Sequence, residues 1–374
     1  MEELRKEFVL AAQDCKNFSA LCREFEITRK TGKKWCERYA DHQPLIDRSR
    51  KPHTIGNKTP PEIEDLIITE RINNPGWGAR TIRQVLANQG YEGLPCDKTV
   101  NNILNRYGLI SEEESLKRKS FTRFEKDHCN EMWQTDFKGE FRTADNLYCY
   151  PLDILDDHSR YLIKIKAYPN TRNVVISTFK AAFEEFGMPA SVLSDNGAQF
   201  SGFKQGYTRF EKWLMDHDIL PIHGRIKHPQ TQGKIERFHR TMKSELLMHR
   251  TFADYYEADA ALNEWRLKYN NIRPHQALGM KRPVEVYHPS DRKYTDRVSS
   301  YDYNGTNHII KVNSWGYARF HKWQVYLSET FIGDYIEFRF NPNGDSFFAC
   351  YRNFIIAEFS TEDGKLIHRK ISRM

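Results

Sequence analysis

The chain has 374 residues, of which 39% are hydrophobic and 29% charged, and its formal net charge at pH 7 is +7. This length predicts roughly two to four packed modules, and the positive charge suits an anionic partner. The sequence contains no apolar run near the roughly 18 residues of a membrane span and no signal-peptide pattern at its N-terminus. Seven cysteines without a Cys-x-x-Cys pair favour reduced thiols, so we expect a cytoplasmic protein with no membrane association and no structural zinc.

Residues 1–42 are predicted to form three short helices, over residues 4–14, 18–25 and 29–39. The third helix is rich in basic residues, which favours a helix-turn-helix module that places this helix in the DNA major groove. A solvated basic helix in a helical hairpin is the alternative. The predicted DNA contacts of this module are Arg29, Lys30, Lys33, Lys34 and Arg38.

Residues 43–59 are poor in apolar side chains and rich in proline, glycine and basic residues, which indicates an extended linker. Such a basic arm can lie in a DNA minor groove, and a plain tether is an equal alternative. The candidate DNA contacts in the linker are Arg48, Arg50 and Lys51.

Residues 60–110 are predicted to form a second helix-turn-helix module, with helices at 60–73, 79–88 and 97–107. Two such modules would recognise a longer DNA site than one. A highly charged connector follows over residues 111–126. The exposed side of the second module carries the predicted DNA contacts Lys98, Asn101 and Asn102.

Residues 127–289 combine predicted strands and helices in the order β-β-β-α-β-α-β-α, which predicts an α/β core with helices covering a mixed sheet. The predicted elements are strands over 136–141, 148–155 and 161–167, a helix over 174–186, a strand ending at Asp195, a helix near 202–216, a strand over 219–222, and helices around Glu236 and over 252–269.

Three carboxylates of this core have distinctive neighbours: Asp136 in Trp133-Gln-Thr-Asp-Phe137, Asp195 in Ser194-Asp-Asn-Gly197, and Glu236 after Pro229-Gln-Thr-Gln-Gly233. The end of a strand in an α/β sheet is where a ligand crevice forms. Ligand sets made only of oxygen favour Mg²⁺ or Mn²⁺ over zinc. Two such ions, roughly 3.5–4 Å apart, can activate an attacking oxygen and stabilise the leaving oxygen in phosphoryl transfer. By spacing alone, these would be three of fifty scattered acids.

Several nearby side chains are alternatives for direct roles at such a site. Asp153, Asp156 and Asp157 could compete for the metal, although Asp156-Asp157-His-Ser is typical of a turn. His223, His228 and His239 could touch DNA, but a structural or surface role is the simpler interpretation of each.

These motifs, with Leu152-Asp-Ile-Leu-Asp-Asp-His-Ser-Arg160 and Tyr269-Asn-Asn-Ile-Arg-Pro-His-Gln-Ala-Leu278, resemble the DDE transposases of bacterial insertion sequences, whose core is similar to that of retroviral integrases. The resemblance implies an RNase H-like fold. It also implies that Asp136, Asp195 and Glu236 are both the catalytic residues and the ligands of two Mg²⁺ ions, for which Mn²⁺ can substitute.

The implied function is that of a transposase enzyme, which binds the terminal inverted repeats of its element, hydrolyses the phosphodiester at each end and joins the 3′-hydroxyl groups to target DNA. Because two ends are joined together, we expect at least a homodimer on double-stranded DNA. A domesticated DNA-binding regulator and an RNase H-fold nuclease without strand transfer are the alternatives. Residues 225–250 contain seven basic and two acidic residues, and the predicted phosphate contacts, which would make binding salt-dependent, are Lys227, Lys234, Arg237, Arg240 and Lys243.

Residues 290–374 change to a strand-rich composition with hairpin signals at Asn341-Pro-Asn-Gly and Glu362-Asp-Gly. By analogy with integrase C-terminal domains, we expect a small SH3-like β-barrel. The candidate strands are 308–312, 318–320, 324–327, 335–340, 347–352 and 355–359.

Overall fold

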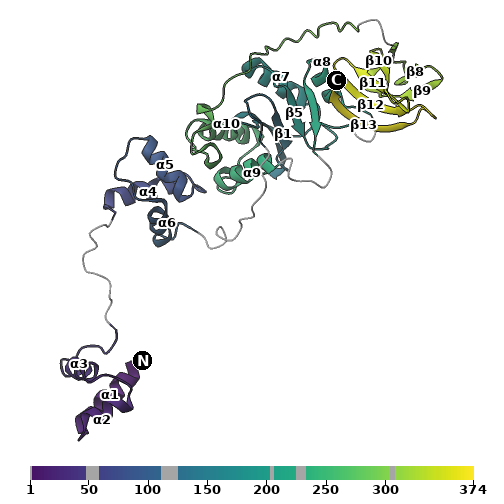
Figure 1. Ribbon diagram of the computed structural model, residues 1–374. Helices are drawn as coiled ribbons and strands as arrows, with labels where there is room; N and C mark the ends of the chain where they lie inside the picture. Colours follow the sequence, from purple (N-terminus) through teal and green to yellow (C-terminus); the bar gives the residue numbers. More distant parts are fainter. Residues whose placement is uncertain (1, 48–58, 111–124, 203–205, 225–232, 304–307) are drawn as a thin grey trace. The chain divides into compact units, whose positions relative to one another are not determined.

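The computed structural model describes residues 2–47, 59–110, 125–202, 206–224, 233–303 and 308–374 (Figure 1). The chain divides into two compact units, Met1–Thr59 and Pro60–Met374. None of the described helices is both long enough and apolar enough to cross a membrane.

The first unit is a bundle of three helices around Phe8, which is fully buried. Asn17 and Thr28 cap the second and third helices through their side-chain oxygens, as their residue types favour. Gly32 allows the third helix to approach closely, because a Cβ there would lie 2.8 Å from the Phe8 ring. The helices are α1 Glu2–Asp14, α2 Phe18–Glu24 and α3 Arg29–Ala40.

The second unit begins with another three-helix module, whose apolar stripes meet around the buried Ile67 and Trp77. An ion pair of 2.5 Å between Arg106 and Glu64 ties its last helix to its first. The helices are α4 Pro61–Asn73, α5 Ala79–Asn88 and α6 Asp97–Arg106.

The core sheet has six strands in the order β2-β3-β1-β5-β6, with β4 paired to β3. β1 runs antiparallel to β3 and parallel to β5, and β5 runs parallel to β6, so the predicted mixed sheet is confirmed. The strands are β1 Trp133–Phe137, β2 Phe141–Arg142, β3 Tyr148–Asp156, β4 Leu162–Tyr168, β5 Ser191–Ser194 and β6 Leu220–His223.

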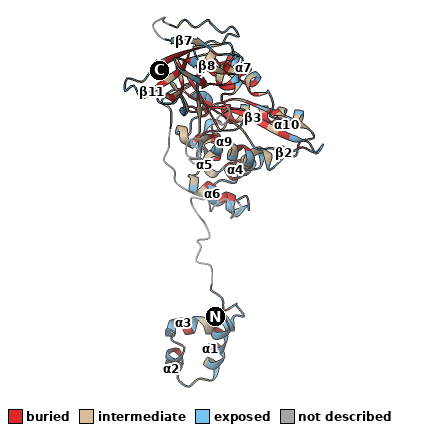
Figure 2. Ribbon diagram, turned by 90° about the vertical axis from the view of Figure 1, so that its right-hand side faces the viewer, coloured by how far each residue is buried: buried red, intermediate tan, exposed pale blue. Residues whose placement is uncertain are grey.

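Helices cover both faces of this sheet, and buried residues concentrate between the layers (Figure 2). Ile154 packs against the helices of one face and Leu155 against those of the other, because successive strand residues point to opposite faces. In β4, Ile163 and Ile165 lie on opposite faces although they are two residues apart, because the β3–β4 register shifts beside Leu155. The core helices are α7 Val175–Phe186, α8 Arg209–Asp216, α9 Gly233–Met242, the π-helix η3 Lys243–Leu247, α10 Tyr255–Asn271, and the 3₁₀ turns η4 Gln276–Leu278 and η5 Pro283–Glu285.

Two predicted boundaries in the core were wrong. The first strand begins at Trp133 and ends at Phe137, so Asp136 lies near its end and not near its start. The helix expected near 202–216 begins only at Arg209. Gly206 has a φ of 124°, which a helix does not accept, and the capping box of Thr208 and Glu211 fixes the true start.

The C-terminal region is rich in strands, but the predicted closed SH3-like barrel is not confirmed. Five strands form an antiparallel sheet in the order β13-β12-β11-β10-β7, and β8 and β9 form a separate hairpin. The last strand was not predicted, because its burial follows no strict alternation: Leu366 and Ile367 are both exposed, and none of its residues is fully buried. The elements are β7 His308–Lys311, β8 Tyr317–Phe320, β9 Trp323–Tyr326, η6 Glu329–Phe331, β10 Tyr335–Phe340, β11 Ser346–Tyr351, β12 Phe354–Ser360 and β13 Leu366–Arg373.

The C-terminal sheet shares its apolar core with the edge of the six-stranded core sheet. Tyr207 and Met215, which belong to the α8 segment, are buried in the same cluster as Phe331, Tyr351 and Ile356 of the C-terminal region. The core sheet and the five-stranded C-terminal sheet are therefore packed together.

Candidate active site

Two of the predicted carboxylates lie at the ends of neighbouring parallel strands. β1 pairs with β5 through Trp133↔Val192 and Gln134↔Leu193. Extending this register by two residues places Asp136 opposite Asp195, on the face covered by α9. The buried Trp133 anchors the strand, since its indole Nε1 donates a 3.0 Å hydrogen bond to Asn130. The structure therefore brings Asp136 and Asp195 together, as strand ends in such a sheet should.

Asp136 is an unusual carboxyl group. Burial, together with the neighbouring Asp153 and Asp195, raises its pKa from 3.8 to about 7, against the opposing effect of His239. A raised pKa means that the ionised form is poorly compensated in this environment. Asp195 is held differently, because its Oδ1 accepts a 2.9 Å hydrogen bond from the backbone N–H of Gly197.

A third aspartate lies beside the first. Asp153 is the cross-strand partner of Asp136 in the β1–β3 pair and is completely buried. His239 of α9 reaches both: its Nε2 lies 2.7 Å from Asp153 Oδ1 and its Nδ1 lies 3.9 Å from Asp136 Oδ2. Burial alone would lower the pKa of His239, but the two aspartates reverse this effect and raise it.

The placement of Glu236 is only partly as predicted. It lies in the first turn of α9, three residues before His239, and residues at this spacing share one helix face. Its side chain is exposed. Within the described ranges, no three His, Cys, Asp or Glu side chains lie close enough together to hold a metal ion. Glu236 as a third ligand stays a prediction.

The site around Asp136 and Asp195 nevertheless fits a divalent cation. Asp153 Oδ2 is buried without a hydrogen-bond partner among the described residues, and burial raises the pKa of Asp153 as well. The site thus has more carboxylate oxygens than donors to satisfy them, and such oxygens are the ligands that Mg²⁺ and Mn²⁺ prefer. Asp136 and Asp195 would hold the ion from the two strand ends.

The other acidic candidates have structural roles. Asp156 accepts hydrogen bonds from the N–H of Asn130 and from the N–H and hydroxyl of Ser159, which is the turn chemistry expected from the sequence. Asp157 is fully buried and accepts hydrogen bonds from Gln134 and from the ammonium of Lys234.

The predicted DNA contacts fall into three groups. Lys234 bonds to Asp157, and Arg38 donates to the Ile46 carbonyl. Arg48, Arg50, Lys51 and Lys227 lie outside the described residues. The remaining side chains are exposed, and their contact with DNA stays a prediction: Arg29, Lys30, Lys33, Lys34, Lys98, Asn101, Asn102, Arg237, Arg240 and Lys243.

Asp153 and its partner His239 are site residues to which the sequence assigns no main role. Asp153 is an alternative metal ligand there, and His239 is interpreted as a structural or surface residue. The available signal was the alternation of β3, in which Asp153 stands between Leu152 and Ile154, both fully buried on the opposite face.

Comparisons with known protein families match three segments of the chain. Two models described as integrase core domain match residues 126–229 and 217–283. A model described as a homeodomain-like domain matches residues 31–104, which covers parts of both helical modules.

Curated relatives match parts of the chain at low identity. An uncharacterised 39.2 kDa protein of insertion element IS476 from Xanthomonas euvesicatoria is 27% identical over 158 residues, covering 42% of this chain and 44% of that protein. The transposase of transposon Tn552 from Staphylococcus aureus is 24% identical over 294 residues, covering 65% of this chain and 54% of that protein. The chain thus spans about half the length of these relatives.

Among solved structures, the catalytic core domain of HTLV-2 integrase in complex with magnesium is 18% identical and has a TM-score of 0.35. It covers 43% of this chain and 99% of that chain. The integrase core and homeodomain-like matches, with the relatives from insertion elements, show that the chain is a relative of the DDE transposases of insertion sequences.

Proposed function

We propose that the chain is a DNA transposase that binds the terminal inverted repeats of its element, hydrolyses the phosphodiester at each end and joins the exposed 3′-hydroxyl groups to target DNA. The observation that carries the proposal is the pair Asp136 and Asp195 at adjacent strand ends, with carboxylate oxygens in surplus. Bound divalent ions, two per site with Glu236 as a further ligand, would supply the activation of the attacking oxygen and the stabilisation of the leaving oxygen.

The chain's own residues would position the DNA. Arg237, Arg240 and Lys243 are exposed on α9 and η3, the helical segment whose His239 lies 3.9 Å from Asp136. Their cations would bind phosphates and orient the scissile strand, and such binding weakens with added salt. The exposed basic residues of α3 and the polar residues of α6 would recognise the repeats.

The joining of two ends implies that two or more protomers act together on DNA. Scattering measurements on the complex with end duplexes should therefore give a mass of at least two chains. A complex with a single chain on each duplex would contradict this part of the proposal.

The test of the whole proposal uses short duplexes with the element's inverted repeats, a plasmid target and Mg²⁺. We expect joined products in which the duplex 3′ end is linked to the plasmid. Tight binding of the repeats with neither cleavage nor joining, in Mg²⁺ or in Mn²⁺, would overturn the proposal in favour of a regulator. Cleavage without joining would instead indicate a nuclease.

Replacing Asp153 with asparagine should lower joining by about 10–100-fold without abolishing it, the range found when partners of metal ligands are removed. Asp153 would act through His239, since it contacts that ring and lies beside Asp136 in the strand pair. Joining rates of Asp153→Asn and the unchanged chain, measured at saturating Mg²⁺, give the comparison. A complete loss would make Asp153 a metal ligand, and an unchanged rate would leave it a packing residue.

A further inference from the structure

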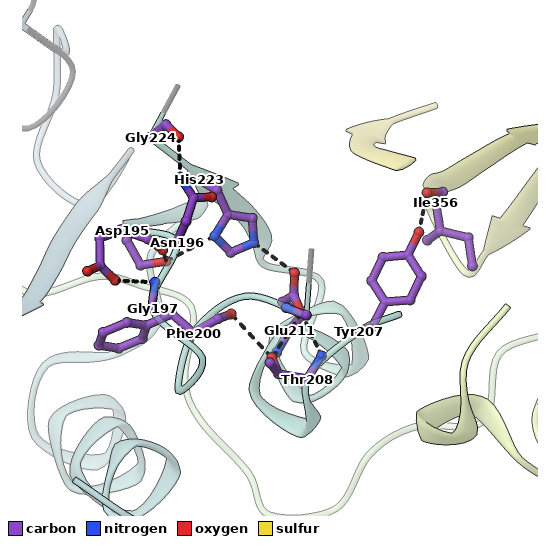
Figure 3. Close-up of polar contacts among 12 residues, drawn as sticks. Asp195, Asn196, Gly197, Phe200, Tyr207, Thr208, Glu211, His223, Gly224 and Ile356 are labelled. Atoms are coloured by element: carbon purple, nitrogen blue, oxygen red, sulfur yellow. Dashed lines mark hydrogen bonds and ion pairs between the residues drawn. The ribbon is translucent and has the colours of Figure 1, made fainter. Parts of the chain in front are cut away.

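The turn that carries Asp195 is connected by hydrogen bonds to a part of the molecule that the proposed chemistry does not use (Figure 3). Ser194, the residue before Asp195, pairs with His223 across the parallel strands β5 and β6. Its hydroxyl lies 3.1 Å from His223 Nδ1. The amide of Asn196, the residue after Asp195, donates a 2.8 Å hydrogen bond to the Gly224 carbonyl.

His223 leads to a buried glutamate. Its Nε2 lies 2.8 Å from Glu211 Oε1, and the side chain of Glu211 is only 4% exposed. The other carboxylate oxygen accepts hydrogen bonds from the backbone N–H groups of Gly202 and Thr208, at 3.1 and 2.6 Å. Glu211 therefore joins three points of the chain at once: Gly202, Thr208 and His223 of β6.

Tyr207, the residue before Thr208, makes three hydrogen bonds to the C-terminal region. Its side-chain hydroxyl donates to the Ile356 carbonyl, its backbone N–H donates to Ser328 Oγ, and its backbone carbonyl accepts from Thr330 Oγ1. The contact is close, because a Cβ on Gly206 would lie 2.5 Å from Ser328 Oγ.

Phe200 connects Thr208 to the strand that carries Asp136. Phe200, between Asp195 and Gly202, packs its ring 5.7 Å from the ring of Phe137, which follows Asp136 in β1. Its carbonyl lies 3.2 Å from the Thr208 hydroxyl. A continuous set of contacts thus runs from the two aspartates, through Glu211, to the C-terminal sheet.

We infer that Glu211 and His223 are positioning residues, which hold the Asp195 turn in its working geometry and transmit to it the docking of the C-terminal sheet. The C-terminal sheet would then be part of the support of the active site. The kinetic part of this inference rests on the proposed function, whereas the structural part does not.

The first test measures amide hydrogen exchange in the full chain. Glu211→Ala should accelerate exchange over residues 194–202 by roughly tenfold, because hydrogen bonds to a buried charged group contribute on that order to local stability. Thr330→Val removes the hydroxyl donated to Tyr207 and should accelerate the same amides from the opposite side of the interface. Amides of β3 should exchange at the unchanged rate in both variants.

Two further variants separate position from bulk stability. Glu211→Gln keeps the length of the side chain and one acceptor oxygen, so it should restore most of the protection that Glu211→Ala loses. Glu257→Ala is the matched control, since Glu257 also accepts a backbone N–H, from Ala253 at 2.6 Å, but lies in the first turn of α10, outside this set of contacts. Equal acceleration across the whole sheet in Glu211→Ala, or none at residues 194–202, would overturn the inference.

The second test measures joining at varied Mg²⁺. We expect the Mg²⁺ concentration for half-maximal joining to rise by about 10–100-fold in Glu211→Ala, while binding of the end duplex without metal is unchanged. A purely structural role would lower the amount of active protein without moving the Mg²⁺ requirement. If the unchanged chain joins no DNA, the proposed function fails, and the exchange measurements still decide whether Glu211 positions the turn.

Discussion

Asp195→Asn should reduce end joining by more than about 100-fold, because replacing even a residue that only orients a metal ligand lowers metal affinity or activity by about 10–100-fold. The substitution keeps the size and the Gly197 hydrogen bond of Asp195 but removes the negative charge that would hold the cation. Binding of the inverted-repeat duplex should stay within about twofold, because it depends on basic residues elsewhere. Joining and binding are measured on the same preparation by product gels and fluorescence anisotropy.

The matched control is Asp254→Asn. Asp254 lies in the same core and caps α10 by accepting a 2.8 Å hydrogen bond from the Glu257 N–H, and asparagine caps a helix about as well as aspartate. Joining should therefore be unchanged in this variant. Full activity in Asp195→Asn would remove Asp195 from the catalytic site, and loss of activity in the control would mean that the assay reports folding.

Asp136→Asn should stabilise the metal-free protein at pH 8 by about 2 kcal/mol. A tenfold change in proton affinity corresponds to about 1.4 kcal/mol, and we discount the full value because the Asp136 side chain is 23% exposed. The pKa of Asp136 is about 7 in the folded chain against an ordinary 3.8. The folded state therefore favours the protonated carboxyl, and its contribution to stability is present below pH 4 and lost as the pH rises to about 7. Asparagine carries no charge and escapes this loss.

The measurement is the thermal transition of the full chain, with and without Asp136→Asn, between pH 4 and pH 9. The stabilisation by asparagine should be near zero at pH 4 and level above pH 8. Mg²⁺ should reverse the order, since a ligand at 100 times its Kd adds about 2.7 kcal/mol to the protein that binds it. A variant less stable than the unchanged chain at every pH, or equally stabilised by Mg²⁺, would contradict the assignment of Asp136 as a metal ligand.

The parts of the site that could be predicted depend on local sequence. Asp136 and Asp195 follow short apolar strands, and strand ends in an α/β sheet meet at one edge, so their proximity was foreseeable. The turn role of Asp156 was also foreseeable, because its partner Ser159, three residues later, completes a local turn pattern.

The parts that could not be predicted depend on contacts between distant residues. His239 and Asp153 are 86 positions apart, and only the packing of α9 on the sheet brings them together. Glu211 has the sequence of an ordinary capping box, which explains Thr208 but not the bond to His223. The open C-terminal sheet was missed because strand propensity does not determine whether a sheet closes.

The shared core of Tyr207, Met215 and the C-terminal sheet also has a consequence for synthesis. Domains generally fold as units, the N-terminal ones first, while the chain leaves the ribosome. The six-stranded core sheet is complete at β6, long before residues 308–374 have been translated. Until then, Tyr207 and Met215 lack their C-terminal apolar partners. We therefore expect the nascent core to expose an aggregation-prone apolar surface and to require chaperone protection until translation is finished.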